Sequence, residues 1–345
     1  MHAAAATSAS ASAARPAAPL PLASVADLPR RYAAILLDQF GCLHDGREAL
    51  PGAVAAVAAL AATGARLVVL SNSSRRAGGA LAKLGRLGFD PACFAGAVTS
   101  GEVAHATLAA QPRAYGSRCL HITWAARGGV SLEGLGLTVC GEREAASVDF
   151  ILVHGTEGVG APGEGDDPAR PGPAPRSLDQ LKTLLETAAA ASPAPPPLLC
   201  ANPDLVTVDG GSLLVMPGTL ASWYEAAGGP VVRLGKPAPP IYAAALAALG
   251  GGIAPGDVLA VGDSLDHDVA GAAAAGMDSL FIGGGIDGAR LGLPSGAGEA
   301  AAYLAGRRGE RSAGSPTVDP AHLAALLAGR LPGQVPTYAM DYLVA

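Results

Sequence analysis

The chain is poor in aromatic residues and contains no CxxC motif. Phe, Trp and Tyr make up 4% of its 345 residues, although hydrophobic residues make up 50%. Any core must therefore be built mainly from Leu, Val and Ala. The five cysteines are widely spaced and form no CxxC pair: Cys42, Cys93, Cys119, Cys140 and Cys200. This spacing argues against a disulfide framework and a zinc site, and it favours a reducing compartment.

The sequence also lacks a long apolar run and a basic excess. Its long charge-free stretches, such as residues 237–256, contain prolines and the glycine run 250–252, which would interrupt a membrane-spanning helix. The formal net charge is -6, and Lys and Arg are scattered along the chain. A protein that binds nucleic acid usually carries a clustered basic surface. We therefore expect neither a membrane nor a nucleic acid as a partner.

The first 24 residues are rich in Ala and Ser, and Arg15 is their only charge. They show no helical or strand periodicity, which predicts a disordered tail over residues 1–24. The absence of acidic residues before Asp27 is also typical of an organelle transit peptide, but a single arginine is a weak signal for one. We expect a cytoplasmic protein, with a chloroplast or a mitochondrion as the alternative.

From about residue 25 onward, apolar segments that resemble strands alternate with alanine-rich segments that resemble helices. The strand segments are 33–38, 66–72, 257–263 and 279–285, and the helical segments are 52–63, 76–87 and 268–275. Alternation of this kind is typical of parallel α/β topology. It predicts a doubly wound parallel sheet with helices on both faces.

A second set of strands and helices separates the first two strands of this pattern from the last two. It comprises strand segments 119–124, 137–140, 149–155 and 198–202, and a helical segment at 177–190. The simplest interpretation is an α/β module at 104–203 inserted into a core made of residues 25–103 and 204–345. Within the module, residues 158–176 are dense in Gly and Pro, which predicts a flexible surface loop.

Polar side chains follow several of the predicted strands or lie in nearby loops. They are Asp38, Ser71, Asn72, Lys236, Asp263 and Asp268. Taken singly, each has an ordinary explanation as a helix cap or a solvated residue. In doubly wound sheets, however, ligands bind beyond the carboxyl ends of the strands. Facing carboxylates there would repel unless a hard cation such as Mg²⁺ lay between them.

The same residue types suit a phosphate group. A metal ion, a hydroxyl, a lysine and helix N-termini at one crevice stabilise phosphate oxygens. A carboxylate held in that crevice can attack phosphorus as a nucleophile. The cluster therefore predicts phosphoryl chemistry if the fold brings its members together.

Four motifs strengthen this interpretation. DQFG (38–41), LSNSS (70–74), GKP (235–237) and GDSLDHD (262–268) resemble, in order and context, the motifs of the haloacid dehalogenase (HAD) superfamily. CANPD (200–204), MPGTLASWYE (216–225) and GKPAPPIY (235–242) resemble its class IIA phosphatases, which carry an inserted α/β cap. The resemblance covers about residues 33–286. It implies a Rossmann-type HAD core with a cap at 104–203 that closes over the site and selects the substrate.

The resemblance also implies a role for each motif residue. Asp38 corresponds to the nucleophile that forms an aspartyl-phosphate, Ser71 and Asn72 to residues that bind the phosphoryl group, and Lys236 to the lysine that neutralises it. Mg²⁺ would be bound by Asp38, the backbone carbonyl of Phe40 and Asp263, and Asp268 would support it through water or hydrogen bonds. The implied activity is Mg²⁺-dependent hydrolysis of the phosphomonoester of a small metabolite.

Phe40 departs from the family pattern. The family usually has a second aspartate two residues after the nucleophile, which acts as general acid and base. Such a group contributes roughly 10²- to 10⁴-fold, whereas enzymatic phosphate-ester hydrolysis can exceed the uncatalysed rate by about 10²¹-fold. Its loss should slow the enzyme without abolishing catalysis. Sugar phosphates should be affected most, and aryl or acyl phosphates least.

Two further expectations concern the loop around Phe40. His44 and Asp45 are candidates for a substitute proton donor, although we expect both to be solvated loop residues. The Phe40 ring is also a candidate for an apolar wall beside the substrate.

Two other functions use the same residues. A catalytically weak binding or regulatory protein would explain Phe40 but not the retention of a nucleophile, and a phosphotransferase would pass the phosphoryl group to an acceptor other than water. The sequence leaves the substrate open, and it leaves a homo-oligomer open as well.

Overall fold

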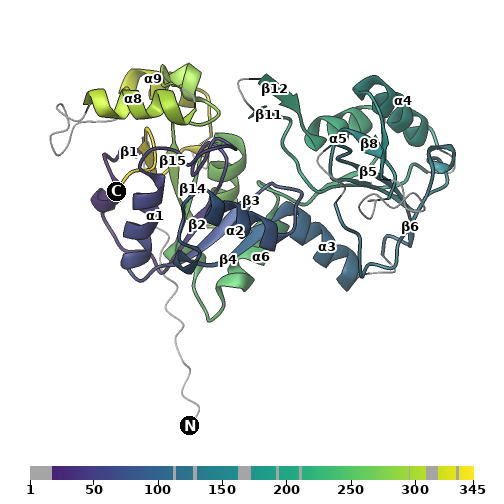
Figure 1. The fold of residues 1–345 in the computed structure, drawn as a ribbon, viewed down its shortest axis with the longest axis horizontal. Coiled ribbons are helices and arrows are strands. Elements are labelled where there is room, and N and C mark those ends of the chain that lie inside the picture. The colour runs from purple at the N-terminus through teal and green to yellow at the C-terminus, as the bar shows by residue number, and fades with distance from the viewer. Residues whose placement is uncertain are drawn as a thin grey trace, which may run out of the picture.

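The computed structural model describes residues 18–111, 114–126, 130–161, 172–191, 194–209, 212–294, 296–307, 318–331 and 334–345. Figure 1 shows two lobes: a core that contains the C-terminus and a cap formed by the middle of the chain. In these described ranges, no helix is both long enough and apolar enough to cross a bilayer.

The core is built on a parallel sheet with the strand order β1-β16-β15-β14-β2-β3-β4. The strands are Leu20–Pro21 (β1), Tyr338–Met340 (β16), Asp278–Ile282 (β15), Val258–Gly262 (β14), Ala34–Leu37 (β2), Arg66–Ser71 (β3) and Phe94–Thr99 (β4). Strand β2 pairs in parallel with β14 on one side and with β3 on the other. The carboxyl ends of these three strands therefore meet at one edge, as the sequence motifs require.

Both faces of the core sheet are buried. Ile35 and Leu37 of β2 pack in one apolar cluster with helix α1 (Ala53–Ala62), whereas Ala34 and Leu36 pack in a second cluster with helix α6 (Pro239–Leu249). Alternate side chains of a strand point to opposite faces, so a strand covered on both sides is apolar throughout. The doubly wound α/β fold expected from the sequence is confirmed.

The core lobe contains further helices beside this sheet. They are α2 (Ala77–Arg86), α3 (Ser100–Ala110), α7 (Ala270–Ala274), α8 (Ala297–Arg307) and α9 (Pro320–Leu327), with a π-helix at Leu265–Val269. Figure 1 places α8 and α9 together at one end of the core lobe.

The cap is a second α/β unit with the strand order β13-β10-β7-β5-β8-β9 and with β6 beside β5. Its strands are Val231–Arg233 (β13), Leu198–Cys200 (β10), Phe150–Val153 (β7), Arg118–Thr123 (β5), Gly158–Val159 (β8), Ala174–Pro175 (β9) and Thr138–Val139 (β6). Helices α4 (Leu178–Ala189) and α5 (Pro217–Ala226) pack in one apolar cluster with this sheet. A separate hairpin joins β11 (Val206–Asp209) to β12 (Ser212–Val215).

The expected cap boundaries of 104 and 203 were wrong at both ends. Strand β13 pairs with β10, so the cap sheet continues to Arg233. At the other end, helix α3 packs against core strand β4 and helix α6. Hydrophobic periodicity identifies a strand or a helix, but it does not say to which of two sheets that element belongs.

The disordered tail expected over residues 1–24 was also too long. Residues 20–21 form strand β1 against β16, and Leu22 is buried, so the segment from residue 18 is part of the core. Residues 1–17 of the expected tail lie outside the described residues. At the other end of the chain, β16 pairs with β15 as a strand of the core sheet. Both strands have too few residues to show a period in the sequence.

The predicted loop at 158–176 was partly wrong. Its two ends form strands β8 and β9, which pair in antiparallel fashion. Residues 162–171, the centre of the expected loop, lie outside the described residues.

Candidate active site

Asp38 lies immediately after β2, at the centre of the carboxyl edge of the core sheet. Its backbone N–H donates to the carbonyl of Val261 on β14 at 2.9 Å, so the ladder continues to the residue itself. The carboxylate then projects beyond the sheet, where the Lys236 Nζ lies 2.6 Å from its Oδ1. A strand ends on a carboxylate here because that side chain faces a buried cation.

Lys236 bridges two carboxylates. Its Nζ also lies 2.6 Å from the Asp268 Oδ1, and its side chain is buried. Although burial opposes it, the charges of Asp268 and Asp38 raise the pKa of Lys236 well above its usual value. The ordinary explanation of a solvated lysine before proline is therefore excluded, and the residue is a permanent cation in the site.

Asn72 fixes the backbone of Lys236. Its Oδ1 accepts from the Lys236 N–H at 2.6 Å, and its Nδ2 donates to the Lys236 carbonyl at 3.2 Å. The neighbouring Ser71 ends β3 and is buried, with its Oγ accepting from the Ser73 N–H at 3.2 Å. The side chain of Asn72 is thus a positioning group for the lysine, and the expected contacts of Ser71 and Asn72 with a phosphoryl group stay predictions.

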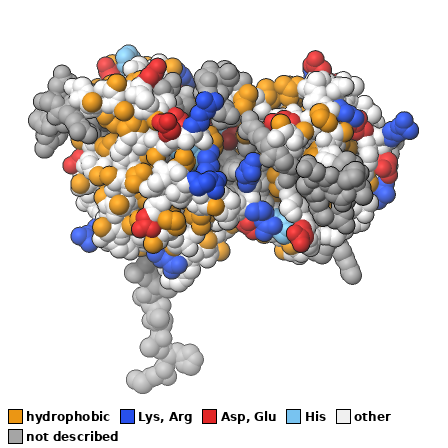
Figure 2. All heavy atoms as spheres, in the orientation of Figure 1, with side chains coloured by type: hydrophobic (Ala, Val, Ile, Leu, Met, Phe, Trp, Pro, Cys, Tyr) orange, Lys and Arg blue, Asp and Glu red, His pale blue; other side chains and the backbone are white. Residues whose placement is uncertain are grey.

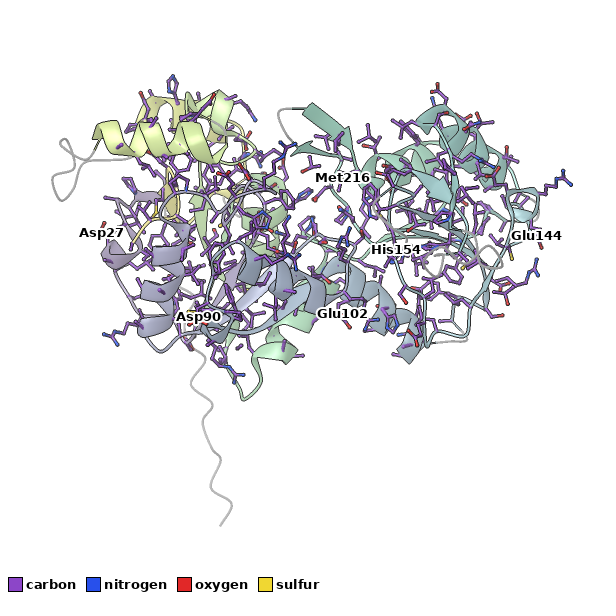
Figure 3. All side chains as sticks on the ribbon, in the orientation of Figure 1. Asp27, Asp90, Glu102, Glu144, His154 and Met216 are labelled. Atoms are coloured by element: carbon purple, nitrogen blue, oxygen red, sulfur yellow. The ribbon has the colours of Figure 1, made fainter. Side chains whose placement is uncertain are left out.

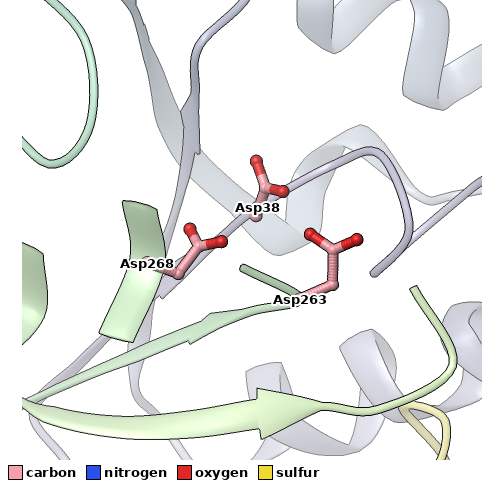
Figure 4. Close-up of side chains that lie close together, drawn as sticks. All are labelled: Asp38, Asp263 and Asp268. Atoms are coloured by element: carbon pink, nitrogen blue, oxygen red, sulfur yellow. The ribbon is translucent and has the colours of Figure 1, made fainter. Parts of the chain in front are cut away.

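Three carboxylates converge beside the lysine. Asp38, Asp263 and Asp268 each offer an oxygen, and these oxygens lie within 4.8 Å of one another. Figure 4 shows the three side chains turned toward a common space. Backbone N–H groups orient the carboxylates of Asp268 and Asp263. The Ser264 N–H donates to the Asp268 Oδ2 at 3.1 Å, and the Ile286 N–H donates to the Asp263 Oδ2 at 2.7 Å.

The positive charge of Lys236 does not offset the burial and mutual repulsion of the carboxylates in this cluster. Burial and the charge of Asp268 raise the pKa of Asp38 to about 7 in spite of Lys236. Burial and the charges of Asp38 and Asp268 raise the pKa of Asp263 well above its usual value. A divalent cation would favour the ionised form of both groups, and carboxylate and carbonyl oxygens are the donors that Mg²⁺ prefers. The residues therefore fit a hard divalent cation.

Two glycines allow the backbone to close around Asp263. A Cβ on Gly41, whose φ is +72°, would lie 1.9 Å from the Asp263 Oδ2, and one on Gly285 would lie 2.1 Å from it. No larger residue fits at either position without displacing the carboxylate. The loop after β2 and the loop after β15 therefore enclose Asp263 from two sides.

The cap contacts the core at this same edge. The Asp204 Oδ1 accepts from the Asn72 Nδ2 at 2.8 Å and lies 3.2 Å from the His267 Nδ1. Although burial opposes it, the hydrogen bonds from His267 and Asn72 hold the pKa of Asp204 below its usual value. On the cap side, the Trp124 Nε1 donates to the Oγ of Ser74 at 3.0 Å.

The sequence did not indicate these links. It showed His267 and Asp204 only as parts of the GDSLDHD and CANPD motifs. The available signal was the position of His267 next to Asp268 in the GDSLDHD motif.

Phe40, two residues after Asp38, is partly exposed to solvent. Its side chain is 41% exposed, and its ring stands over Gly46, where an added Cβ would lie 2.8 Å from the ring. The His44 ring meets it edge-on with centroids 4.6 Å apart, and the Lys83 Nζ lies 4.6 Å from the ring centroid. The ring is therefore held in place by its neighbours while part of it stays open to solvent.

Of the two candidates for a substitute proton donor, His44 is not the solvated loop residue that the sequence predicted, whereas Asp45 is partly exposed. His44 is fully buried, its Nδ1 accepts from the Gly46 N–H at 3.0 Å, and burial lowers its pKa to about 4. The Asp45 carboxylate accepts from the N–H groups of Arg47, Glu48 and Ala297. These bonds give Asp45 a structural role in holding the loop against the start of α8.

A parallel α/β core, an inserted α/β cap and an Asp–Lys–Asp cluster at the carboxyl ends of the central strands define a capped hydrolase of the HAD type. Sequence comparison agrees. Residues 35–136 match the family model of haloacid dehalogenase-like hydrolases, and residues 233–304 match a second, HAD-hydrolase-like model. The chain belongs to the HAD superfamily, and its cap is of the class IIA type.

Solved structures resemble most of the chain. A haloacid dehalogenase-like hydrolase from Brucella suis 1330 is 27% identical, with a TM-score of 0.66 over 94% of this chain and 100% of that one. A glycerol phosphate phosphatase from Mycobacterium tuberculosis, in complex with calcium, is 25% identical, with a TM-score of 0.51 over 74% of this chain and 67% of that one. NagD from E. coli K-12 shares the fold at 19% identity, with a TM-score of 0.54 over 91% and 97% of the two chains. No curated protein sequence matches the chain.

Proposed function

We propose that the chain is a Mg²⁺-dependent phosphomonoester hydrolase that acts on a small phosphorylated metabolite through Asp38. The contact that carries this proposal is the buried Lys236 Nζ, 2.6 Å from both Asp38 and Asp268, beside a third carboxylate. The similarity to a glycerol phosphate phosphatase, also crystallised with magnesium, supports the reaction class and the metal. Lys and Arg side chains gather along the boundary between core and cap in Figure 2, which would attract an anionic substrate.

The reaction would proceed in two displacements. In the first, an Asp38 oxygen forms a bond to phosphorus while the bond from phosphorus to the ester oxygen breaks, and the departing alkoxide takes a proton from solvent. In the second, water attacks phosphorus, its proton passes to solvent, and the Asp38 carboxylate is released with inorganic phosphate. Lys236 would stabilise the phosphoryl oxygens throughout. A bound Mg²⁺, held by Asp38, Asp263 and the Phe40 carbonyl, would supply further charge neutralisation.

Phe40 determines which esters react well. The Phe40 side chain has no proton to give to the departing alkoxide, so the rate should depend strongly on the leaving group. We expect Phe40→Asp to raise kcat/KM for glycerol phosphate by about 10²-fold or more, because a positioned acid contributes roughly 10²- to 10⁴-fold. The rate for p-nitrophenyl phosphate, whose leaving group needs little protonation, should change far less.

Steady-state kinetics on the two esters would measure this difference, with Phe40→Asn as the control that has a similar shape to the aspartate but no acid. An equal gain on both esters, or a gain in Phe40→Asn as well, would show that removing the ring matters and that the acid does not.

Metal binding should depend on pH. Because the pKa of Asp38 is about 7 and that of Asp263 is also raised, protons must leave before a cation binds. We expect Mg²⁺ at about 100 times its dissociation constant to stabilise the folded chain by about 2.7 kcal/mol at pH 8. The same concentration should stabilise it much less at pH 5.

Thermal unfolding in Mg²⁺ and in a chelator at both pH values would measure this effect. Asp263→Asn should remove the Mg²⁺-dependent shift, whereas Asp179→Asn, an exposed aspartate on α4, should keep it. A shift of equal size at pH 5 and pH 8 would argue against binding by these carboxylates.

A further inference from the structure

Several exposed apolar side chains belong to segments that build or adjoin the site. Among the described residues, the large hydrophobic side chains that remain exposed are Leu20, Phe40, Val54, Leu205, Val206, Ile286 and Leu331. Four of these are near residues of the site in sequence or through a backbone hydrogen bond: Phe40, Leu205, Val206 and Ile286. Scattered single apolar residues need no explanation, but a group of them around one concave site does.

Phe40 and Ile286 flank Asp263 on the core side. Gly41 and Gly285 approach so closely that a Cβ on Gly41 would lie 3.1 Å from the Gly285 Cα. Phe40 precedes one of these glycines, and Ile286 follows the other. The Ile286 N–H binds the Asp263 Oδ2 at 2.7 Å, yet its side chain is 54% exposed. Two residues with exposed apolar side chains therefore lie in the backbone segments that enclose the same carboxylate.

Leu205 and Val206 lie in the chain segment on the cap side of the site. They follow Asp204, whose carboxylate binds Asn72, and they are 53% and 39% exposed. The Leu205 carbonyl accepts from the Met216 N–H at 2.9 Å, which fixes this segment at the foot of the β11–β12 hairpin. Figure 1 shows the hairpin near the boundary between the lobes, and Figure 3 places Met216 at its foot.

We propose that Phe40, Leu205, Val206 and Ile286 form an apolar rim that binds an apolar chain or ring in the organic part of the substrate. This inference rests on the proposed function. The buried charges hold the phosphoryl group, so the organic part must extend outward past the rim. A sugar would leave its hydroxyl groups against four side chains that cannot hydrogen-bond to them, whereas an apolar group would cover surface that is now exposed. The substrate class is therefore a phosphate monoester of an apolar alcohol.

Ethyl, butyl and hexyl phosphate provide the test, because their leaving groups have nearly the same basicity and differ mainly in apolar length. In Mg²⁺, the wild type should gain about two- to fourfold in kcat/KM for each added CH₂, the upper figure being that of a fully buried one. The gain should come mostly from a lower KM. Binding of the non-hydrolysable ethyl- and hexylphosphonates, measured by calorimetry, should show the same preference without turnover.

Leu205→Ser and Ile286→Ser should each reduce the hexyl-to-ethyl ratio by about three- to tenfold, since each removes one apolar wall. The ratio is measured because a general loss of activity would lower kcat/KM for both esters equally and leave the ratio unchanged. Val54→Ser on α1 and Leu331→Ser make the same kind of change at exposed apolar positions on other elements, and both should keep the wild-type ratio.

The outcomes separate this inference from the proposed function. Hydrolysis that requires Asp38 but has a flat chain-length profile would overturn the rim and leave the phosphatase standing. Rim variants that slow ethyl and hexyl phosphate equally would also overturn it, because the side chains would then serve cap closure alone. Rim-dependent binding of hexylphosphonate without any turnover would support the rim and overturn the phosphatase.

Discussion

Replacing Asp38 with asparagine is expected to lower kcat/KM for every phosphate ester by at least about 10⁴-fold, because the amide cannot form the bond to phosphorus. The variant should stay folded, since Asn keeps the backbone hydrogen bond to β14 and Lys236 keeps its contact with Asp268 at 2.6 Å. The measurement is steady-state hydrolysis of p-nitrophenyl phosphate in Mg²⁺. Asp179→Asn, on an exposed face of the cap, is the matched control and should retain full activity.

A rapid-mixing experiment on the wild type would add a second readout. Without a general base at position 40, hydrolysis of the phosphoenzyme should be slow, so p-nitrophenol should appear in a burst of about one equivalent per active chain. Loss of the burst in Asp38→Asn would assign it to this carboxylate. If the wild type and Asp38→Asn hydrolyse every ester equally, the binding-protein alternative becomes the better account. If an added alcohol accelerates release after the burst, the phosphotransferase becomes the better account.

Replacing Lys236 with methionine is expected to destabilise the chain by about 3–5 kcal/mol at neutral pH, because it leaves buried carboxylates without their cation. The loss should shrink as the pH falls toward 7. Lys236 lowers the pKa of Asp38, which is about 7 in the wild type, so the variant takes up this proton at a higher pH than the wild type and gains stability first. Protonation of the carboxylates in the variant thus replaces the missing charge.

Denaturant unfolding at pH 5 and pH 8 would measure this change, with Lys182→Met as the matched control on an exposed lysine. Mg²⁺ should partly restore Lys236→Met at pH 8, since a second cation can neutralise the same oxygens. An equal loss of stability at both pH values would indicate a packing defect and would contradict the electrostatic role.

The sequence alone predicted the fold class and several residues that the fold brings together. Continuous apolar segments such as 33–38 can be buried on both faces, and their alternation with helices left a parallel doubly wound sheet as the simplest solution. The residues that end those strands, Asp38 and Ser71, had to meet at one edge because parallel strands share their carboxyl side. Lys236 and Asp263 were found through their motifs, which are local in sequence.

Only the tertiary structure decided which sheet each later element joined. Strand β13 pairs with β10 in the cap, and β1 pairs with β16 at the edge of the core, although β1 and β16 lie at opposite ends of the chain. Pairing depends on backbone hydrogen bonds between distant segments, and short strands carry no period that reveals a partner. The expected domain boundaries failed for this reason.

The contacts that surround the motif residues likewise could not be predicted from the sequence. The contact of Asp204 with Asn72 and His267, the burial of His44 under the Phe40 ring, and the pairing of exposed Ile286 with Asp263 all join residues from separate loops. A sequence determines which chemical groups are available and where strands and helices can form. Distances, burial and the resulting pKa values arise only when loops far apart in the chain are brought to the same edge of a sheet, and those quantities set the charge of this site and the character of its rim.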